Sequence, residues 1–270
     1  MTPTEVVPRQ VSRHFSAHAV EYDRYAVVQK QVVRRLLTLL PSDAADLGPV
    51  LDIGCGTGEL ARQLSTRFPR LPLAIADIAH GMTCCAATQL AGVTAFDADA
   101  QALPVGPTRF GMVVSSSMYQ WVNDLPGAFT ENHRVLRPGG AFVFALFVAD
   151  TLKELRVSYQ QALDELGNPY PSHMQEFVGV AEVRQALASA GFEAVRLETA
   201  YEVEHHPDVV TLLKNIKHIG AQNAAKERPA GLGLRRVTQR MIELYTAIYA
   251  TGGTVPATYQ VVYGVGRKKD

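Results

Sequence analysis

An acidic residue and three glycines at alternate positions form the segment of this chain best suited to hold a ligand. The segment reads Val50-Leu51-Asp52-Ile53-Gly54-Cys55-Gly56-Thr57-Gly58-Glu59-Leu60. The apolar run before the glycines predicts a strand, and the residues after them predict a helix. Glycine permits positive φ and close approach of a ligand to the main chain, and a helix begins at the turn with its positive end. The segment therefore predicts a ligand-binding turn.

The glycine spacing separates two classes of nucleotide-binding fold. The G-x-G-x-x-G fingerprint of nicotinamide and flavin folds requires glycine at position 59, where this chain has Glu59. The pattern D-x-G-x-G-x-G instead resembles motif I of the class I S-adenosylmethionine methyltransferases. This resemblance implies that Asp52 attracts the ammonium group of the methionine tail, directly or through water. The turn around the cofactor would consist of Gly54, Cys55, Gly56 and Gly58. A glycine-rich turn without a ligand is the alternative.

Acidic residues also stand at the ends of two further predicted strands. Ligands of open α/β sheets bind beyond the carboxyl ends of the strands, and Asp77 and Asp99 occupy such positions. The resemblance implies that Asp77 accepts hydrogen bonds from the ribose hydroxyls and that Asp99 accepts one from the adenine amine. Taken alone, each acid is also compatible with a helix cap. The other cofactor-binding candidates are Ile78 and Met82 on the adenine face, the Ala100 amide, Gln29 and Ser115.

Predicted strands and helices alternate around the glycine turn, which favours a parallel sheet with helices on both faces. Strands are expected at 49–53, 72–77, 92–97, 110–115 and 141–147, and helices at 57–68, 81–91 and 125–136. Helical periodicity also covers 10–40, 151–166, 180–190, 207–220 and 231–250, with strands at 194–203 and 258–265 and a break at 168–172. The resemblance implies an α/β fold with a Rossmann-like, seven-stranded class I methyltransferase sheet.

The chain divides into three predicted parts. Residues 1–40 form an N-terminal helical lid segment, 41–150 form the cofactor-binding core, and 151–270 complete the core. Methyltransferase sheets usually end in an antiparallel strand pair joined by a short link. Here the link, at about 204–256, is long and helical, which favours a lid over the site. Enlargement of the core is the alternative.

Segments outside the shared motifs resemble the malonyl-acyl-carrier-protein O-methyltransferases of biotin synthesis, and the resemblance covers nearly the whole chain. The matching segments are 22–29 (YDRYAVVQ), 120–121 (QW), 136–140 (LRPGG), 151–156 (TLKELR), 213–221 (LKNIKHIGA) and 256–265 (PATYQVVYGV). Two positions depart from the family pattern. Ser116 stands where the family usually has asparagine, and Glu176 stands before Phe177 where it usually has arginine.

The resemblance implies methyl transfer to the free carboxylate of a malonyl thioester. Such a carboxylate is ionised at neutral pH, so the reaction needs placement and desolvation more than a general base. A buried carboxylate needs a cation or several donors, and Arg156 is the first candidate because guanidinium binds carboxylates bidentately. Lys217 is the second. Tyr22 is expected to close over the sulfonium, and Tyr119, Gln120 and Trp121 are expected to line the acceptor pocket.

Composition excludes several other classes of function. The 270 residues contain 26 Lys plus Arg and 26 Asp plus Glu, a balance that indicates neither a nucleic-acid nor a membrane partner. The first ten residues lack the apolar core of a signal peptide. The three cysteines show no spacing typical of a metal site. We therefore expect a metal-free, cytoplasmic protein.

A local excess of positive charge suggests a macromolecular partner. Between Thr211 and Arg240, seven cations face one acid, Glu227; the cations are Lys214, Lys217, Lys226, Arg228, Arg235, Arg236 and Arg240. This excess favours docking of an acidic acyl-carrier protein that carries the malonyl group, with malonyl-CoA as the alternative methyl acceptor; a solvated helix face is the other interpretation of the excess. Two further functions remain open: a methyltransferase for another small acid or a quinone precursor, and a non-catalytic subunit that binds S-adenosylmethionine.

Overall fold

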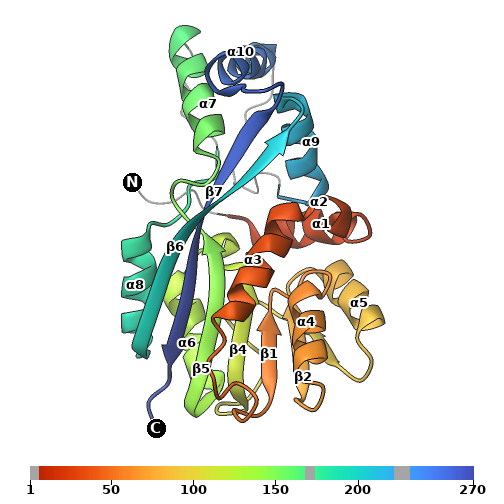
Figure 1. The fold of residues 1–270 in the computed structure, drawn as a ribbon, viewed down its shortest axis with the longest axis vertical. Helices are drawn as coiled ribbons and strands as arrows, with labels where there is room; N and C mark the ends of the chain where they lie inside the picture. The colour runs from red at the N-terminus through yellow and green to blue at the C-terminus, as the bar shows by residue number, and fades with distance from the viewer. Residues whose placement is uncertain (1–5, 168–173, 222–231) are drawn as a thin grey trace.

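The computed structural model describes residues 6–167, 174–221 and 232–270. Its centre is a seven-stranded sheet in the order β3-β2-β1-β4-β5-β7-β6 (Figure 1). Pairing is parallel from β3 to β5 and antiparallel on both sides of β7. The strands are β1 (Val50–Ile53), β2 (Leu73–Asp77), β3 (Thr94–Asp97), β4 (Phe110–Ser116), β5 (Leu136–Phe147), β6 (Glu193–His206) and β7 (Val255–Arg267). The α/β fold with a Rossmann-like, seven-stranded sheet that was predicted from the sequence is confirmed.

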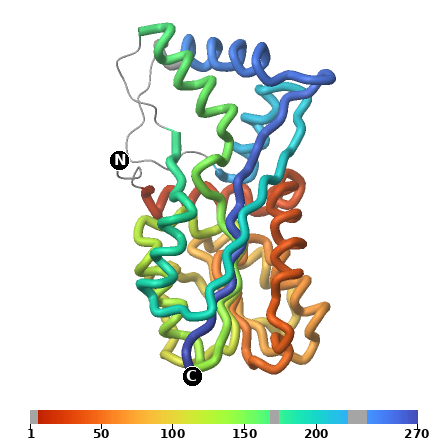
Figure 2. Tube along the Cα trace, turned by 60° about the vertical axis from the view of Figure 1, so that its left-hand side comes forward, coloured from red at the N-terminus to blue at the C-terminus, as the bar shows by residue number. Residues whose placement is uncertain are grey.

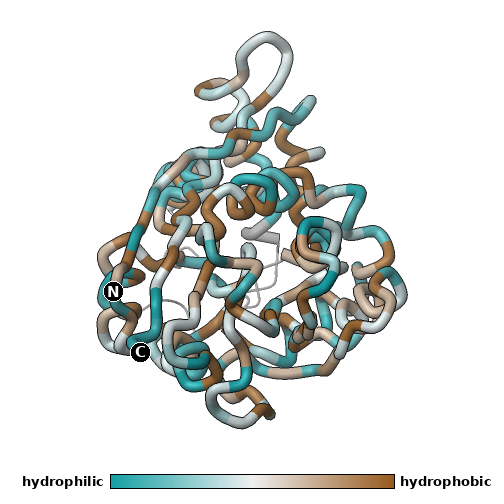
Figure 3. The backbone as a smooth tube through the Cα atoms, turned by 60° about the horizontal axis from the view of Figure 1, so that its bottom comes forward, coloured by the Kyte–Doolittle hydropathy of each residue, from teal (hydrophilic) through white to brown (hydrophobic). Residues whose placement is uncertain are grey.

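Helices cover both faces of the parallel part of the sheet. One face carries α3 (Val27–Thr38), α4 (Glu59–Arg67) and α5 (His80–Gln89), and the other carries α6 (Leu125–Val135) and α8 (Val180–Ser189). All four residues of β1 are buried, as expected for a central parallel strand covered on both sides. Hydrophobic and hydrophilic residues alternate along the surrounding helices (Figure 3). Because helices pack on both faces, the sheet is rigid, and it holds the residues at the carboxyl ends of its strands in fixed positions.

The N-terminal helical region is broken into three pieces rather than one. The pieces are α1 (Pro8–His18), α2 (Tyr22–Tyr25) and α3, and Ala26 between α2 and α3 leaves the helical region with φ −81° and ψ 52°. Gly81 lets α1 lie close to α5, because a Cβ there would approach Ser16 O to 2.8 Å. Because of these breaks, α1 and α2 turn across the carboxyl ends of the strands (Figure 1). One continuous helix in the direction of α3 would have run past those ends.

The β6–β7 ribbon is longer than the sequence predicted, and it extends beyond β5. Pairing of β7 with β5 stops at Phe147↔Val261, whereas pairing with β6 continues to His206↔Val255. Three helices lie at this extended end: α7 (Lys153–Glu165), α9 (Val209–His218) and α10 (Leu232–Tyr249) (Figures 1 and 2). Their apolar side chains continue the core. The predicted break at 168–172 lies outside the described residues, and no helix within them is long and apolar enough to span a bilayer.

Candidate active site

The glycine turn takes a conformation that side chains would disfavour. Gly54, Gly56 and Gly58 have φ values of +69°, +54° and +92°. A Cβ on Gly54 would lie 2.2 Å from Cγ of Met118, so this position tolerates no side chain. Gly58 caps α4 without lining the cavities, and the amide of Gly56 donates to Oδ2 of Asp77 at 3.0 Å. The turn therefore links the carboxyl ends of β1 and β2.

Asp52 is a buried acid without a partner. It is 1% exposed, and neither carboxylate oxygen has a hydrogen-bond partner within the described chain. Burial, and then the nearby charge of Asp77, raise the pKa of Asp52 to about 8. Asp52 lines a cavity of about 50 Å³ together with Gln29, Cys55 and the turn glycines Gly54 and Gly56. An ammonium group in this cavity would pair with the ionised carboxylate of Asp52 and lower its pKa.

A second cavity, of about 80 Å³, adjoins the turn on its other side. Asp77 lines it and accepts from Ala79 N at 2.8 Å as well as from Gly56 N. Burial raises the pKa of Asp77 to about 6. Four other residues predicted to bind the cofactor line the same cavity: Ile78, Met82, Asp99 and Ala100. These features fit a nucleoside that carries an amino acid. Asp52 has carboxylate oxygens without partners in the described chain, Asp77 can accept further hydrogen bonds, and the turn glycines leave room for close approach.

The short helix α2 closes over this region. Tyr22 lines the two small cavities and a third, larger one. The next residue, Asp23, accepts a hydrogen bond from the hydroxyl of Thr57 at 2.7 Å, and its carbonyl accepts one from Lys30 Nζ at 2.5 Å. Burial raises the pKa of Tyr22 above its ordinary value. Its phenol is therefore a neutral donor at the junction of the cavities. The hydrogen bond between Asp23 and Thr57 was not predicted from the sequence, although both residues stand inside segments that resemble family motifs.

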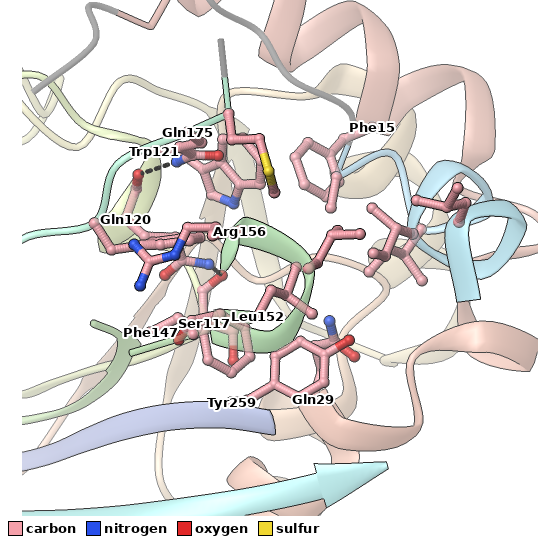
Figure 4. A pocket seen from close by; sticks show the side chains of 18 of the residues that line it. Phe15, Gln29, Ser117, Gln120, Trp121, Phe147, Leu152, Arg156, Gln175 and Tyr259 are labelled. Atoms are coloured by element: carbon pink, nitrogen blue, oxygen red, sulfur yellow. Dashed lines mark hydrogen bonds between the residues drawn. The ribbon is translucent and has the colours of Figure 1, made fainter. Parts of the chain in front are cut away.

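The third cavity has a volume of about 440 Å³ and mainly apolar walls (Figure 4). Within the described chain, Arg156 is the one charged residue among those that line it. Nη2 of Arg156 donates to Ala149 O, and Nε is buried without a hydrogen-bond partner in the part of the chain that the structure describes. The apolar lining includes Phe147, Leu152 and Tyr259, together with Leu155 from α7 and Leu213 and Ile216 from α9. A single cation in such surroundings suits an acceptor with one negative group on an apolar or neutral body.

Further unsatisfied polar atoms gather where the cavities meet. The hydroxyls of Ser116 and Ser117 and Oε1 of Gln120 are buried without partners in the described structure. Gln120 Nε2 donates to Ser117 O at 2.7 Å, and Gln175 Nε2 donates to Gln120 O at 2.8 Å. Trp121 lines both the 80 Å³ and the 440 Å³ cavities. These atoms are available to a ligand that spans the two cavities.

Besides Gly58, three predicted site residues lie away from these cavities. Tyr119 is 1% exposed in an aromatic cluster, its hydroxyl accepts from Asn132 Nδ2 at 2.5 Å, and its ring lies 5.1 Å from that of Phe129. It belongs to the core rather than the acceptor pocket. Ser115 is fully buried in β4. Lys217 is exposed on α9 and does not line the large cavity, whereas Leu213 and Ile216 of the same helix do.

Sequence reasoning also missed lining residues. Gln175 and Phe177 line the large cavity, whereas Glu176 between them is exposed and does not. The departure at Glu176 therefore leaves the cavity unchanged. The alternation of residue types over 175–177 was the available signal. No helix or strand is predicted there, so the alternation does not tell which side chains face inward.

The positive excess on the later helices is only partly available to a partner. Arg235 and Arg236 are exposed at the start of α10, and Lys214 is exposed on α9. Arg240 is paired with Glu165 at 2.6 Å and Glu243 at 3.1 Å. Lys226 and Arg228 lie outside the described residues.

Comparison with known proteins shows which family this chain resembles. A family model described as a methyltransferase domain matches residues 51–144. Curated malonyl-[acyl-carrier protein] O-methyltransferases from Geobacter sulfurreducens and Methylococcus capsulatus are 41% and 32% identical, each over 96% of this chain, and 98% and 94% of their own lengths are covered.

Solved structures show the same fold at lower identity. A SAM-dependent methyltransferase from Thermotoga maritima has a TM-score of 0.55 at 19% identity, over 96% of this chain and 100% of its own. Haemonchus contortus phosphoethanolamine N-methyltransferase 2, solved with S-adenosylmethionine, has a TM-score of 0.57 at 18% identity, over 94% and 57%. Near-complete coverage by relatives above 30% identity, on a class I sheet with its glycine turn and strand-end acids, shows that the chain belongs to the S-adenosylmethionine-dependent malonyl-[acyl-carrier protein] O-methyltransferase family.

Proposed function

We propose that this chain methylates the free carboxylate of malonyl carried as a thioester on acyl-carrier protein, an early step of biotin synthesis. One observation carries the proposal: a buried, unpartnered Nε of Arg156 lies in an apolar cavity that shares Tyr22 with the cofactor turn. A guanidinium in such a place selects an anionic end group. The neutral, apolar remainder of the cavity suits the acyl thioester behind that group.

The residues of the two small cavities would hold S-adenosylmethionine. Asp52 would bind the ammonium group, Asp77 the ribose hydroxyls, and Asp99 with the Ala100 amide the adenine edge, between Ile78 and Met82. Bound there, the cofactor supplies an electrophilic methyl group on a sulfonium. Gln29 and Cys55 line the end of the cleft nearest Asp52.

The chain's own residues would then place the acceptor. The malonyl carboxylate is already ionised, so Arg156 holds it and no side chain needs to take a proton. The apolar walls exclude water, which strengthens the pairing and favours an in-line approach. Tyr22, with a neutral phenol, and the side chains of Gln120 and Trp121 would fix the acceptor at the boundary between the cavities.

We further propose that α7, α9 and α10 form the lid over the acceptor, and that exposed Lys214, Arg235 and Arg236 receive the acidic carrier protein. We place the reaction in the cytoplasm, the compartment expected from the sequence. The residues of α9 that line the acceptor cavity support the lid, and the exposed, like-charged positions support the docking surface.

Charge reversal tests the docking surface. Arg235→Glu and Arg236→Glu are each expected to lower kcat/KM for malonyl on carrier protein by about tenfold, because complementary charge mainly sets the association rate. Neither should change kcat/KM for malonyl-CoA. Arg70→Glu is the control, since Arg70 is exposed in the loop before β2, at the opposite edge of the sheet. Equal losses with both substrates would place the docking surface elsewhere.

Removal of one carboxylate tests the ribose site. Asp77→Ala is expected to raise the Kd for S-adenosylmethionine by about 5- to 150-fold, or ~1–3 kcal/mol, because hydroxyls lose their acceptor in a buried site. Asp97→Ala is the matched control, because Asp97 also ends a strand but is exposed and pairs with His80. Isothermal titration measures both constants. An unchanged affinity for Asp77→Ala would mean that the ribose lies elsewhere.

One assay decides between the proposal and its rivals. Malonyl-carrier protein incubated with enzyme and S-adenosylmethionine should gain one methyl group by mass spectrometry, and unloaded carrier protein should gain none. Methylation of a free acid or a quinone precursor in preference would support a different acceptor. Cofactor binding without turnover on any of these would indicate a non-catalytic subunit.

A further inference from the structure

We infer that Thr151 and Glu154 are positioning residues that hold Arg156 in the acceptor cavity. They fasten the beginning of α7 to a free edge of β7, and Arg156 stands two residues after Glu154. The inference rests on the proposed function, because it assigns a task to Arg156. It explains why a threonine and a glutamate precede the arginine in the segment 151–156.

The free edge arises where β5 ends. β5 pairs with β7 as far as Phe147↔Val261, but β7 runs on toward Val255 with β6 as its sole strand partner. The backbone groups of Gln260 and Thr258 on the other edge therefore need partners from elsewhere. Val148 N donates to Gln260 O at 2.9 Å, and Leu152 N donates to Thr258 O at 2.6 Å.

Two side chains complete this ladder. The hydroxyl of Thr151 donates to Gln260 O at 3.1 Å and accepts from Gln260 N at 3.2 Å. The carboxylate of Glu154 accepts from Thr258 N at 3.2 Å and from the Thr258 hydroxyl. Thr151 is 1% exposed and Glu154 is 4% exposed. These side chains take the place of a continuation of β5, which pairs antiparallel with β7, and the donors of Thr258 offset the cost of burying an acid.

This attachment fixes the direction in which α7 begins. Leu152 has φ +52°, a left-handed conformation that costs free energy and needs support from its surroundings. The bonds of Thr151 on one side of Leu152 and of Glu154 on the other supply that support. Arg156 N then donates to Leu152 O at 3.0 Å, and its guanidinium donates back to Ala149 O. The guanidinium is thus held between two anchored turns of chain, and its Nε has no hydrogen-bond partner among the residues that the structure describes.

Substitutions that keep size but change hydrogen bonding test the inference. Thr151→Val removes the hydroxyl, and Thr151→Ser retains it. Glu154→Gln replaces one carboxylate oxygen by an amide NH2 group. Either the N–H of Thr258 then loses its acceptor, or the hydroxyl of Thr258 must accept a hydrogen bond instead of donating one. Thr151→Val and Glu154→Gln are each expected to raise KM for malonyl-carrier protein about tenfold, because a misplaced binding group loses affinity steeply with distance. Thr151→Ser should stay near wild type, and the cofactor Kd should not change in any variant.

A double-mutant cycle separates positioning from general destabilisation. With Arg156→Ala as background, Glu154→Gln is expected to raise KM no further, because the group that it places is absent. Ala162→Gly weakens the same helix away from the anchors and should lower Tm without raising KM; Asp164→Asn, exposed on α7, should change neither.

The outcomes distinguish this inference from the proposed function. If the wild type methylates malonyl-carrier protein and Arg156→Ala raises KM, but Thr151→Val and Glu154→Gln do not, the positioning role is wrong and the proposed function stands. Additive effects of Glu154→Gln and Arg156→Ala would also overturn it. If the wild type does not methylate this acceptor, the proposed function fails first. Loss of Tm with unchanged KM would show that the anchors are structural alone.

Discussion

Arg156→Ala is expected to lower kcat/KM for malonyl-carrier protein by about 10²- to 10³-fold, or ~3–4 kcal/mol, since it leaves a desolvated carboxylate unpaired. The loss should be equally large with malonyl-CoA, because both share the malonyl end. Arg156→Lys should recover part of it, since a point charge replaces a bidentate donor. The Kd for S-adenosylmethionine, measured by titration, should stay at the wild-type value because Arg156 does not line the two small cavities.

Lys217→Ala is the matched control for this experiment. Lys217 was the second cation expected from the sequence, but it is exposed on α9 and does not line the acceptor cavity. Its removal should leave kcat/KM for malonyl-CoA unchanged. The assignment of Arg156 would be contradicted if Lys217→Ala caused the large loss while Arg156→Ala caused none. A loss in cofactor affinity with Arg156→Ala would instead indicate that the variant disturbs the whole site.

The affinity for S-adenosylmethionine is expected to rise with pH up to about 8 and then to level off. Burial raises the pKa of Asp52 to about 8 in the unligated chain. The cofactor's ammonium group needs the ionised form, so below that pH its binding must also remove a proton. The expected slope approaches tenfold in Kd per pH unit. Asp77, with a pKa of about 6, adds a second dependence at lower pH.

The same group has the opposite effect on the stability of the unligated protein. The pKa of Asp52 is higher in the folded state than the ordinary aspartate value, so its contribution to stability is complete below pH ~4 and is lost as pH rises toward 8. The loss is about 1.4 kcal/mol per pH unit over that interval. Bound cofactor should reverse it. The shift in Tm on adding S-adenosylmethionine should therefore be larger at pH 8 than at pH 6.

Asp52→Asn provides the control for both measurements. An amide of the same shape does not titrate, so the pH dependence of Kd between 6 and 8 should disappear. At pH 8 the affinity should fall by about 100-fold, because a desolvated charge pair is lost. The unligated variant should gain stability at pH 8 relative to the wild type. If Kd retained its full pH dependence in Asp52→Asn, another group would be responsible for it.

The cofactor cleft was predictable because its residues follow from strand ends. Parallel strands finish at one edge of a sheet, so Asp52, Asp77 and Asp99 could be brought together from the order of strands and helices alone. The glycine turn added the prediction that a ligand can approach the main chain closely at the end of β1. In each case a local pattern and a topological rule acted together, and the structure places the three acids around adjoining cavities.

The acceptor cavity was less predictable, because its walls come from separate elements. Three consecutive residues, 119–121, were expected to line the acceptor pocket, but Tyr119 points into the aromatic core while Gln120 and Trp121 face the cavity. A tight helical turn offers no periodicity from which to choose between them. Gln175 and Phe177 reach the cavity through the path of a non-periodic segment. Such contacts depend on long-range packing rather than on local sequence.

The position of β7 has a consequence for synthesis of the chain. It is the last strand along the sequence, yet it lies between β5 and β6. In a nascent chain that has emerged only as far as β6, the edges of β5 and β6 that β7 will later join are unpaired. Such edges are prone to intermolecular pairing and to recognition by chaperones. The sheet closes only after β7 (Val255–Arg267) has left the ribosome, and a frameshift before Val255 leaves a product whose sheet lacks this strand.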